Sequence, residues 1–500
     1  MRSTFYHSLR RNQQMLSQSL SLEKNDDIVS RSFTALGQSC ALYYVEGMAS
    51  GERMAESVLR PLLRAQGELS GRAALEAVTL RLIEAPEVKC EKQPYAAVQE
   101  LMRGQVLLLM DSVDEAVLVD LRGYVRRAVS IPQTENVVIG PHEAFTEPLR
   151  DNLTMLHRML PSPLLICKLG QVGTRIPTQT AVCWLDGICP QETLDEIERR
   201  LSGAALDHVL TVGELSQLIE DDPFAPLPQV VSTERPDRAV SFLLEGQAVL
   251  LIDGSPRCLA MPVSLWHLFH APDDTYMRWM YGVFMRVVRA VGAALALLLP
   301  AVFVSLVIFH PLALPMSLLT NIIQSRSIVS ISLFGEAVLM LTVFDLINEA
   351  GTRIPGLMGS SFGLVSALIL GTAAVDAGLV SPLLIIVVAL SGLGSYALPN
   401  YSLSFAFRMG QMALLIAGGL MGLPGVYLLL LLMVLRVAGM ESLGRPFLAP
   451  VSPRRTRNPD LIFRAPLFRQ RLRSYLAAPE NLLRAHGRMR RFDEGRRRQP

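Results

Sequence analysis

The chain has 500 residues, of which 50% are hydrophobic and 18% are charged, and its mean hydropathy is +0.33. These values exclude a disordered or collagen-like chain, and the charged fraction is too low for an ordinary soluble enzyme, where it is about 25%. The length corresponds to about three folding units. The formal net charge is only +2, so the distribution of charge along the chain is more informative than its sum.

Charged side chains divide the sequence into three zones. Residues 292–439 contain only eight of them. The tail 454–500 has fourteen Arg against four acidic residues, a local net charge of +10, which leaves −8 for the rest of the chain. The pattern indicates a polar N-terminal half, an apolar block and a basic cytoplasmic tail.

Residues 1–34 are polar and lack the apolar stretch of a signal peptide. We expect this N-terminal segment to be weakly ordered or loosely helical. All six cysteines lie between residues 40 and 258, and their spacings fit no zinc motif. We interpret them as buried, small hydrophobic residues of a cytosolic region, and we predict neither a metal ion nor another cofactor.

The polar half contains an internal duplication. ALYYVEGM at 41–48 matches AVCWLDGI at 181–188, and AAVQELMRGQVLLLMDS at 96–112 matches RAVSFLLEGQAVLLIDG at 238–254, at offsets of 140 and 142 residues. Each copy predicts strand, turn and helix, followed by helix, glycine and strand. The sequence therefore predicts a cytosolic α/β region of two duplicated subdomains and a connector helix and strand, with the boundaries 35–130, 131–174 and 175–270.

The apolar block 285–442 predicts an α-helical polytopic membrane domain, because a bilayer core of about 30 Å needs about 20 mostly apolar helical residues. We expect four to six spans from the candidate segments 287–309, 328–349, 357–375, 382–398, 403–420 and 424–437. The Arg-rich flanks place both terminal regions in the cytoplasm by the positive-inside rule. The tail 454–500 is expected to contact anionic lipid headgroups and no nucleic acid.

Segment 328–349 carries three carboxylates, which usually face a bundle interior or an aqueous path when they lie in a bilayer. On a helical wheel, one polar stripe contains Thr342, Asp345, Asn348, Glu349 and Thr352. The stripe has two interpretations. It either lines an ion path of an oligomer, where carboxylates favour cations, or belongs to an interfacial helix in which Arg353 pairs with Glu349.

Four charged residues are candidate intramembrane charges, namely Glu336, Arg353, Asp376 and Arg408. Glu336 lies on the face of its helix opposite the polar stripe. Asp376 ends an apolar segment and is expected at the membrane interface. Arg408 is expected to extend towards the interface or to pair with a carboxylate.

Three short motifs resemble catalytic or metal-binding signatures but lack what the chemistry requires. HEAFTE at 142–147 has Thr146 where HExxH has its second histidine. GSSFG at 359–363 matches GxSxG but opens an apolar helix, so its spacing suits close helix packing in lipid. HxxH at 267–270 is interpreted as one face of an amphipathic stretch. We therefore predict that the chain is not an enzyme.

Several segments together are similar to one known family. They are GPHEAFTEPLRDNLTMLHRML at 140–160, EGQAVLLIDGSPRCLAMP at 245–262, HAPDDTYMRW at 270–279, GEAVLMLTVFDLINEAGTRIP at 335–355, residues 371–408, and SLGRPFLAPVSP at 442–453. On these residues the chain resembles the A subunit of bacterial spore germinant receptors, the GerA family, over about residues 30–470. Tyr276 stands alone where that family often has two adjacent tyrosines. The same family includes a stage V sporulation AF-type membrane paralogue.

Some residues in these segments match the family's motifs and are expected to be structural. They are Gly140, Glu143, Phe145, Glu147, Asn152, Asp253 and Gly254. The resemblance implies an integral protein of the inner spore membrane that relays a nutrient signal for germination. It also implies a transporter-like B subunit and a lipoprotein C subunit as partners, and a homo-oligomer that in one hypothesis is an ion channel.

Two other functions compete with this one. A sporulation-stage paralogue would assist the release of ions or small molecules. A secondary transporter would need inverted repeats among its spans, whereas the duplication found here lies in the polar half.

Overall fold

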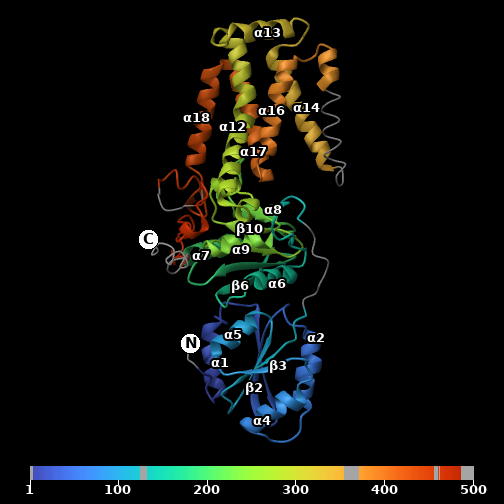
Figure 1. The fold of residues 1–500 in the computed structure, drawn as a ribbon, viewed down its shortest axis with the longest axis vertical. Helices are drawn as coiled ribbons and strands as arrows, with labels where there is room; N and C mark the ends of the chain where they lie inside the picture. The colour runs from blue at the N-terminus through green and yellow to red at the C-terminus, as the bar shows by residue number, and fades with distance from the viewer. Residues whose placement is uncertain (1–3, 124–131, 354–370, 455–459, 461, 486–500) are drawn as a thin grey trace, which may run out of the picture.

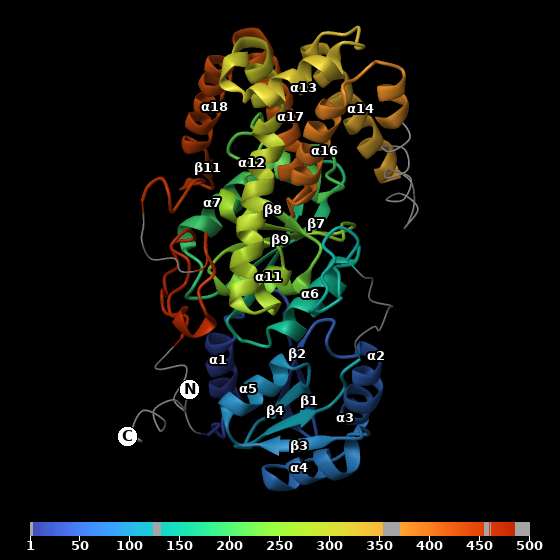
Figure 2. The ribbon, with the colours of Figure 1, turned by 45° about the horizontal axis from the view of Figure 1, so that its top comes forward.

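The computed structural model describes residues 4–123, 132–353, 371–454, 460 and 462–485. Three parts follow one another along the long axis of the molecule (Figures 1 and 2). A first α/β unit lies at one end, a second α/β unit lies in the middle, and a group of helices lies at the other end.

The first unit is a five-stranded antiparallel sheet with helices on both faces. Its strand order is β1-β2-β4-β5-β3. The strands are β1 (Ile28–Ala35), β2 (Gln38–Val45), β3 (Val88–Glu91), β4 (Val106–Met110) and β5 (Ala116–Val119). The helices are α1 (Leu9–Ser19), α2 (Gly51–Met54), η1 (Ala55–Leu59), α3 (Arg60–Arg64), α4 (Arg72–Ala77), η2 (Val78–Leu82) and α5 (Pro94–Met102).

The second unit repeats this architecture with the strand order β6-β7-β9-β10-β8. The strands are β6 (Leu165–Val172), β7 (Thr178–Leu185), β8 (Val231–Thr233), β9 (Ala248–Ile252) and β10 (Cys258–Met261). The helices are α6 (Leu149–Met159), α7 (Gln191–Ser202), α8 (Val212–Ile219), α9 (Pro236–Leu244), α10 (Leu265–Leu268) and α11 (Asp273–Tyr276). The two equal strand orders are the structural counterpart of the duplication found in the sequence.

Alternation along the strands explains why each sheet is covered on both faces. Successive side chains of a strand point to opposite faces. Leu107 and Leu109 of β4 pack in the same cluster as α1 and α5, whereas Leu108 and Met110 pack against the helices between α2 and η2. Alternate side chains of β9 likewise pack against α6 and α9 on one face of the second sheet and against α7 and α8 on the other.

The repeat includes the N-terminal segment, which forms the well-defined helix α1 instead of a weakly ordered stretch. Helix α1 occupies the place in the first unit that α6 occupies in the second. Leu9 donates its backbone N–H to Asp111 Oδ1 at 2.9 Å, and Leu149 donates to Asp253 Oδ1 at 2.9 Å. Because these bonds are equivalent, we propose that the repeats begin near residues 5 and 145.

The remaining helices form the membrane region. They are α12 (Trp279–Phe309), η3 (Pro311–Ala313), α13 (Met316–Arg326), α14 (Leu333–Arg353), α16 (Pro382–Tyr396), α17 (Tyr401–Met421) and α18 (Leu423–Ala438). In Figure 1, α13 lies across the end of the molecule that is farthest from the first unit.

The number of long apolar helices corrects the expectation of four to six spans. Among the described residues, α12 and α17 are long and apolar enough to cross a membrane by themselves. Helices α16 and α18 are apolar but shorter, and α14 does not reach the apolarity of the other two because it carries three carboxylates. Most of the candidate segment 357–375 lies outside the described residues.

The chain returns from α18 to the second unit through β11 (Glu441–Ser442), β12 (Arg445–Pro446) and a segment that contains η4 (Leu467–Arg469). Ser442 donates its hydroxyl to the Gln229 carbonyl at 2.7 Å, and Arg484 pairs with Glu245 at 2.6 Å. The second unit and residues 441–485 therefore lie on the same side of the membrane helices (Figure 1).

Candidate functional site

The predicted polar stripe on α14 divides into an inner and an outer half. Asp345 is half-buried, and its carboxylate lies 3.5 Å from the Arg408 guanidinium of α17. Asn348 accepts a hydrogen bond from the Tyr396 hydroxyl of α16. These two residues therefore fix α14 to its neighbours by polar contacts inside the apolar region.

The outer half of the stripe is more exposed than the inner half. Thr342 and Glu349 are exposed, and the Thr342 hydroxyl bonds back to the Val338 carbonyl of its own helix at 2.8 Å. The side chains of Thr352 and Arg353 lie outside the described residues, so the expected pairing of Arg353 with Glu349 stays a prediction.

The other candidate charges of the membrane region have different surroundings. Glu336 is fully buried in the first turn of α14, 3.2 Å from Arg326 Nε, and it accepts the Ser381 N–H at 3.1 Å. This carboxylate thereby connects α13, α14 and the start of α16. Asp376 is exposed.

A second buried ionic group connects the second unit to the base of α12. Asp274 of α11 is 2% exposed and receives two bonds from Arg289 of α12, at 2.7 and 3.0 Å. Arg286, one turn earlier on α12, lies 3.4 Å from the same carboxylate. In the sequence, Arg289 counted only as part of the Arg-rich flank of the first span and was not paired with an acid. The sequence did contain a signal for this pair, because Arg289 lies 15 residues after Asp274, an acid that precedes the first span.

The family-motif residues, which lie between Gly140 and Gly254, contact other parts of the second unit. Asn152 is fully buried and bonds both the N–H and the carbonyl of Thr146, at 2.7 and 2.6 Å. Asn12 makes the same two bonds with Tyr6, at 2.8 and 2.6 Å. The amide therefore closes the loop before the first helix of each unit.

The other motif residues also pack or bond locally. Phe145 is 1% exposed, the backbone carbonyl of Glu147 accepts the Gly254 N–H at 2.9 Å, and the Glu143 carboxylate pairs with Arg158. A Cβ on Gly140, whose φ is +138°, would meet the Tyr276 ring at 2.7 Å.

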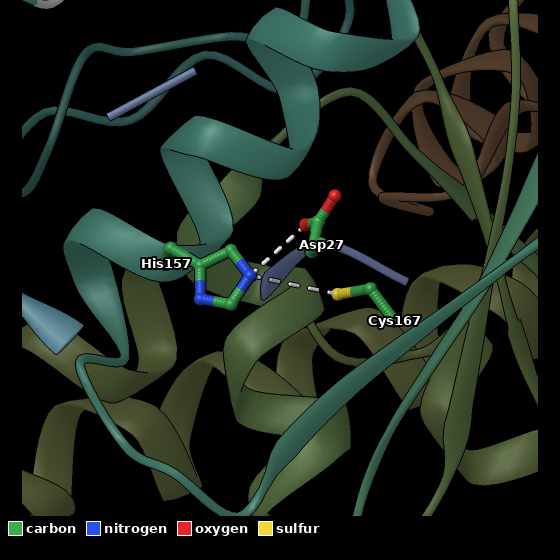
Figure 3. Close-up of side chains that lie close together, drawn as sticks. All are labelled: Asp27, His157 and Cys167. Carbon is green, nitrogen blue, oxygen red and sulfur yellow. Dashed lines mark hydrogen bonds and ion pairs between the residues drawn. The ribbon is translucent and has the colours of Figure 1, made fainter. Parts of the chain in front are cut away.

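A cluster that sequence reasoning missed lies where the two units meet (Figure 3). Asp27, just before β1, and His157 and Cys167 of the second unit are all fully buried. Their donor atoms lie within 4.8 Å of one another, a spacing from which a metal ion could be held. The residues are 130 and 10 positions apart, so no local motif reveals them.

Burial and contacts shift the pKa values of this cluster. Burial lowers the pKa of His157, but the hydrogen bond to Asp27 and the contact with Cys167 outweigh it and raise that pKa to about 10. A hydrogen bond with Cys183, together with burial, raises the pKa of the Cys167 thiol. His157 Nδ1 is buried without a hydrogen-bond partner.

A cavity of about 130 Å³ lies at the junction of the second unit, the base of α12 and the returning tail. Its polar lining includes Arg238, Glu245, Asp274, Arg286 and Arg464. Each of the three arginines bonds a carboxylate or a backbone carbonyl. The charges around the cavity are therefore largely satisfied by the protein itself.

Comparison with known proteins gives consistent matches over most of the chain. The pattern of the family described as "Bacillus/Clostridium GerA spore germination protein" matches residues 14–476. Spore germination protein KA of Bacillus subtilis (strain 168) is 32% identical over 445 residues, which cover 89% of this chain and 82% of that protein. Spore germination protein GerLA of Bacillus cereus is 31% identical over 415 residues, which cover 83% and 84%.

One solved structure is similar to part of the chain. It is the crystal structure of the N-terminal domain of the A subunit of the Bacillus megaterium spore germinant receptor GerK3. The match has a TM-score of 0.41 and 24% sequence identity, and it covers 52% of this chain and 97% of that one.

Proposed function

Because this chain belongs to the GerA family of spore germination proteins, we propose that it is the membrane subunit of a nutrient-responsive germinant receptor. In this role it relays the germination signal across the inner spore membrane. Its family membership makes it a germination protein and not an enzyme. The transporter-like B subunit and the lipoprotein C subunit of such a receptor are its proposed partners.

The arrangement of the parts supports a topology with both terminal regions in the cytoplasm. The second unit and the returning tail contact each other, so they lie on one side of the membrane. Arg278, Arg286 and Arg289 at the base of α12 and the arginines of the tail give that side an excess of positive charge. Positive charge next to spans favours the cytoplasmic side.

The exposed half of the α14 stripe is the observation that supports an oligomeric ion path. Glu349 is exposed on a helix that packs beside α12, α16 and α17. A carboxylate at membrane depth is stabilised by water or by another protein surface, not by lipid. Several copies of α14 facing one another would bring the exposed Thr342 and Glu349 of each copy beside those of the next, and a ring of carboxylates favours cations.

Cation flux through vesicles that contain the reconstituted receptor tests this role. We expect the variant Thr342→Leu/Glu349→Gln to lower the flux at least about tenfold, since it removes the exposed polar groups. The control is Asp376→Asn, which removes another exposed carboxylate of the membrane region and should leave the flux within about twofold of the parent. Equal flux from parent and stripe variant would refute the ion path on α14.

Germination of spores that carry the same variants tests the signalling role separately. Spores with the stripe variant should keep the protein at normal abundance and respond more slowly to nutrient. If spores that lack this protein keep every nutrient response, the proposed receptor function is wrong.

A further inference from the structure

The buried cluster of Asp27, His157 and Cys167 combines three kinds of donor atom at the contact between the two α/β units. Asp27 Oδ2 lies 3.0 Å from His157 Nε2, and Cys167 Sγ lies 3.9 Å from the same nitrogen. Donors bound to one Zn²⁺ at about 2.0–2.3 Å lie roughly 3.3–3.8 Å from each other in tetrahedral geometry. The two distances from His157 Nε2 are therefore within a few tenths of an ångström of those in a metal site, and all three donor atoms lie within 4.8 Å of one another.

The chemistry of the three atoms also favours a cation between them. His157 Nε2 faces both a carboxylate oxygen and a sulfur (Figure 3). The proton on Nε2 serves the carboxylate oxygen at 3.0 Å and leaves the sulfur with only a long contact at 3.9 Å. A bound cation satisfies all three atoms at once, because each presents a lone pair.

The surroundings hold each donor in place. Arg150 donates to the other oxygen of Asp27 at 3.0 Å, which leaves Oδ2 directed at the cluster. The Cys167 backbone is bonded on both sides, since its N–H reaches Asn25 Oδ1 at 3.3 Å and its carbonyl accepts the Asp26 N–H at 3.1 Å. Outer partners of this kind orient metal ligands in proteins.

A further cysteine lies on the neighbouring strand. Cys183 of β7 is the direct cross-strand partner of Cys167 of β6, but it does not belong to the group of donor atoms that lie within 4.8 Å of one another. Cys183 is fully buried, like the other three residues.

We propose that Asp27, His157 and Cys167 bind one Zn²⁺ ion that joins the two α/β units. Thiolate and imidazole ligands select zinc over magnesium and calcium. Binding releases the Cys167 thiol proton and the His157 Nε2 proton to water, and it strengthens as the pH rises because protons and metal compete for the same lone pairs. Since the site is buried, the ion enters while the chain folds, and it ties Asp27 of the first unit to the second.

Metal analysis of the full-length protein, purified in detergent at pH 8 without chelator, tests the proposal. We expect about one zinc per chain, with at least about tenfold less in Cys167→Ala and in His157→Ala. The matched control is Cys258→Ala, which removes a buried cysteine of the same sheet outside the cluster and should keep the metal.

A second measurement covers the case in which these variants do not fold. Wild-type protein from cells grown with cobalt should show the near-ultraviolet absorption of a cobalt–thiolate bond, and it should lose that band on unfolding with a chelator. Wild-type protein without stoichiometric metal, or with metal that persists in Cys167→Ala, overturns the site. Neither result bears on the germination role.

Discussion

The buried imidazole of His267 caps the first turn of α10. Its Nδ1 lies 3.0 Å from the Ser264 hydroxyl and accepts the Ser264 N–H at 3.2 Å, and the side chain is 6% exposed. Burial, together with the charges of Arg238 and Arg286, lowers the pKa of His267 to about 3. The residue therefore stays neutral in the folded protein at every pH near neutrality.

This lowered pKa predicts a loss of stability in acid. In the unfolded chain His267 takes up a proton near pH 6.5, but in the folded chain it does so only near pH 3. Its contribution to stability is thus complete above pH 6.5 and falls by about 1.4 kcal/mol for each pH unit below that value. Denaturant unfolding of the full chain in detergent at pH 7, 6 and 5 measures this slope.

The variant His267→Gln, which cannot take up a proton, should lose the part of the slope that belongs to this residue. His142→Gln is the control, because it makes the same substitution at an exposed histidine outside α10. Parallel profiles for the parent and His267→Gln would show that His267 is not the group responsible.

The membrane helices contact one another through small residues. A Cβ on Gly394 of α16 would meet the Gly292 carbonyl oxygen of α12 and would lie 3.1 Å from the Ala296 nitrogen. A Cβ on Gly418 of α17 would lie 2.5 Å from Ser305 Oγ of α12. Without the hydrophobic effect of water, helices in lipid associate mainly through such close packing.

Replacement of Gly394 by alanine should therefore separate α16 from α12. We expect Gly394→Ala to destabilise the membrane region by about 1–3 kcal/mol, as overpacking does in a close-packed interior. Thermal unfolding in detergent measures the change. The control is Gly439→Ala, whose Cβ would lie 3.6 Å from the nearest atom in ordinary van der Waals contact, and equal melting temperatures for the two variants would refute this packing.

Elements that depend on local patterns could be predicted from the sequence. Strands β4 and β9 were expected as apolar runs after a helix and a glycine, and Gly104 and Gly246 end those helices with φ near +90°. A positive φ is easy for glycine and strained for other residues, so the glycine is a reliable local signal.

Features that depend on distant partners could not be predicted in this way. Helix α1 is polar on its own, and what includes it in the first unit is its bond to Asp111, 102 residues later, and the packing of Leu9 and Leu16 against β4 and α5. The Asp27–His157–Cys167 cluster forms because edge strand β6 of one sheet approaches the start of edge strand β1 of the other. For the membrane helices, apolarity indicated the region but not the length of each helix.

At the scale of the whole molecule, α12 is the continuous connection between the α/β units and the far end of the membrane region (Figure 1). Its 31 residues correspond to about 46 Å of helix. At its base, Arg289 and Arg286 share the buried carboxylate of Asp274. A movement of the second unit would therefore reach the membrane helices through this ionic group.

Removal of the shared charge should loosen this connection. Asp274→Asn leaves the buried Arg289 guanidinium without its carboxylate, whereas Arg286 keeps its ion pair with Asp460. Removal of one partner of a buried ion pair destabilises a protein by about 3–5 kcal/mol. We expect faster cleavage by trypsin after Arg286 and Arg289 and a slower germination response at unchanged protein abundance. Asp273→Asn is the matched control, since this neighbouring carboxylate accepts the Val138 N–H at 3.1 Å instead. If trypsin cleaves Asp274→Asn at the same sites and rate as Asp273→Asn, the α11–α12 contact persists without the ion pair. Packing alone would then transmit a movement of the second unit to the membrane helices.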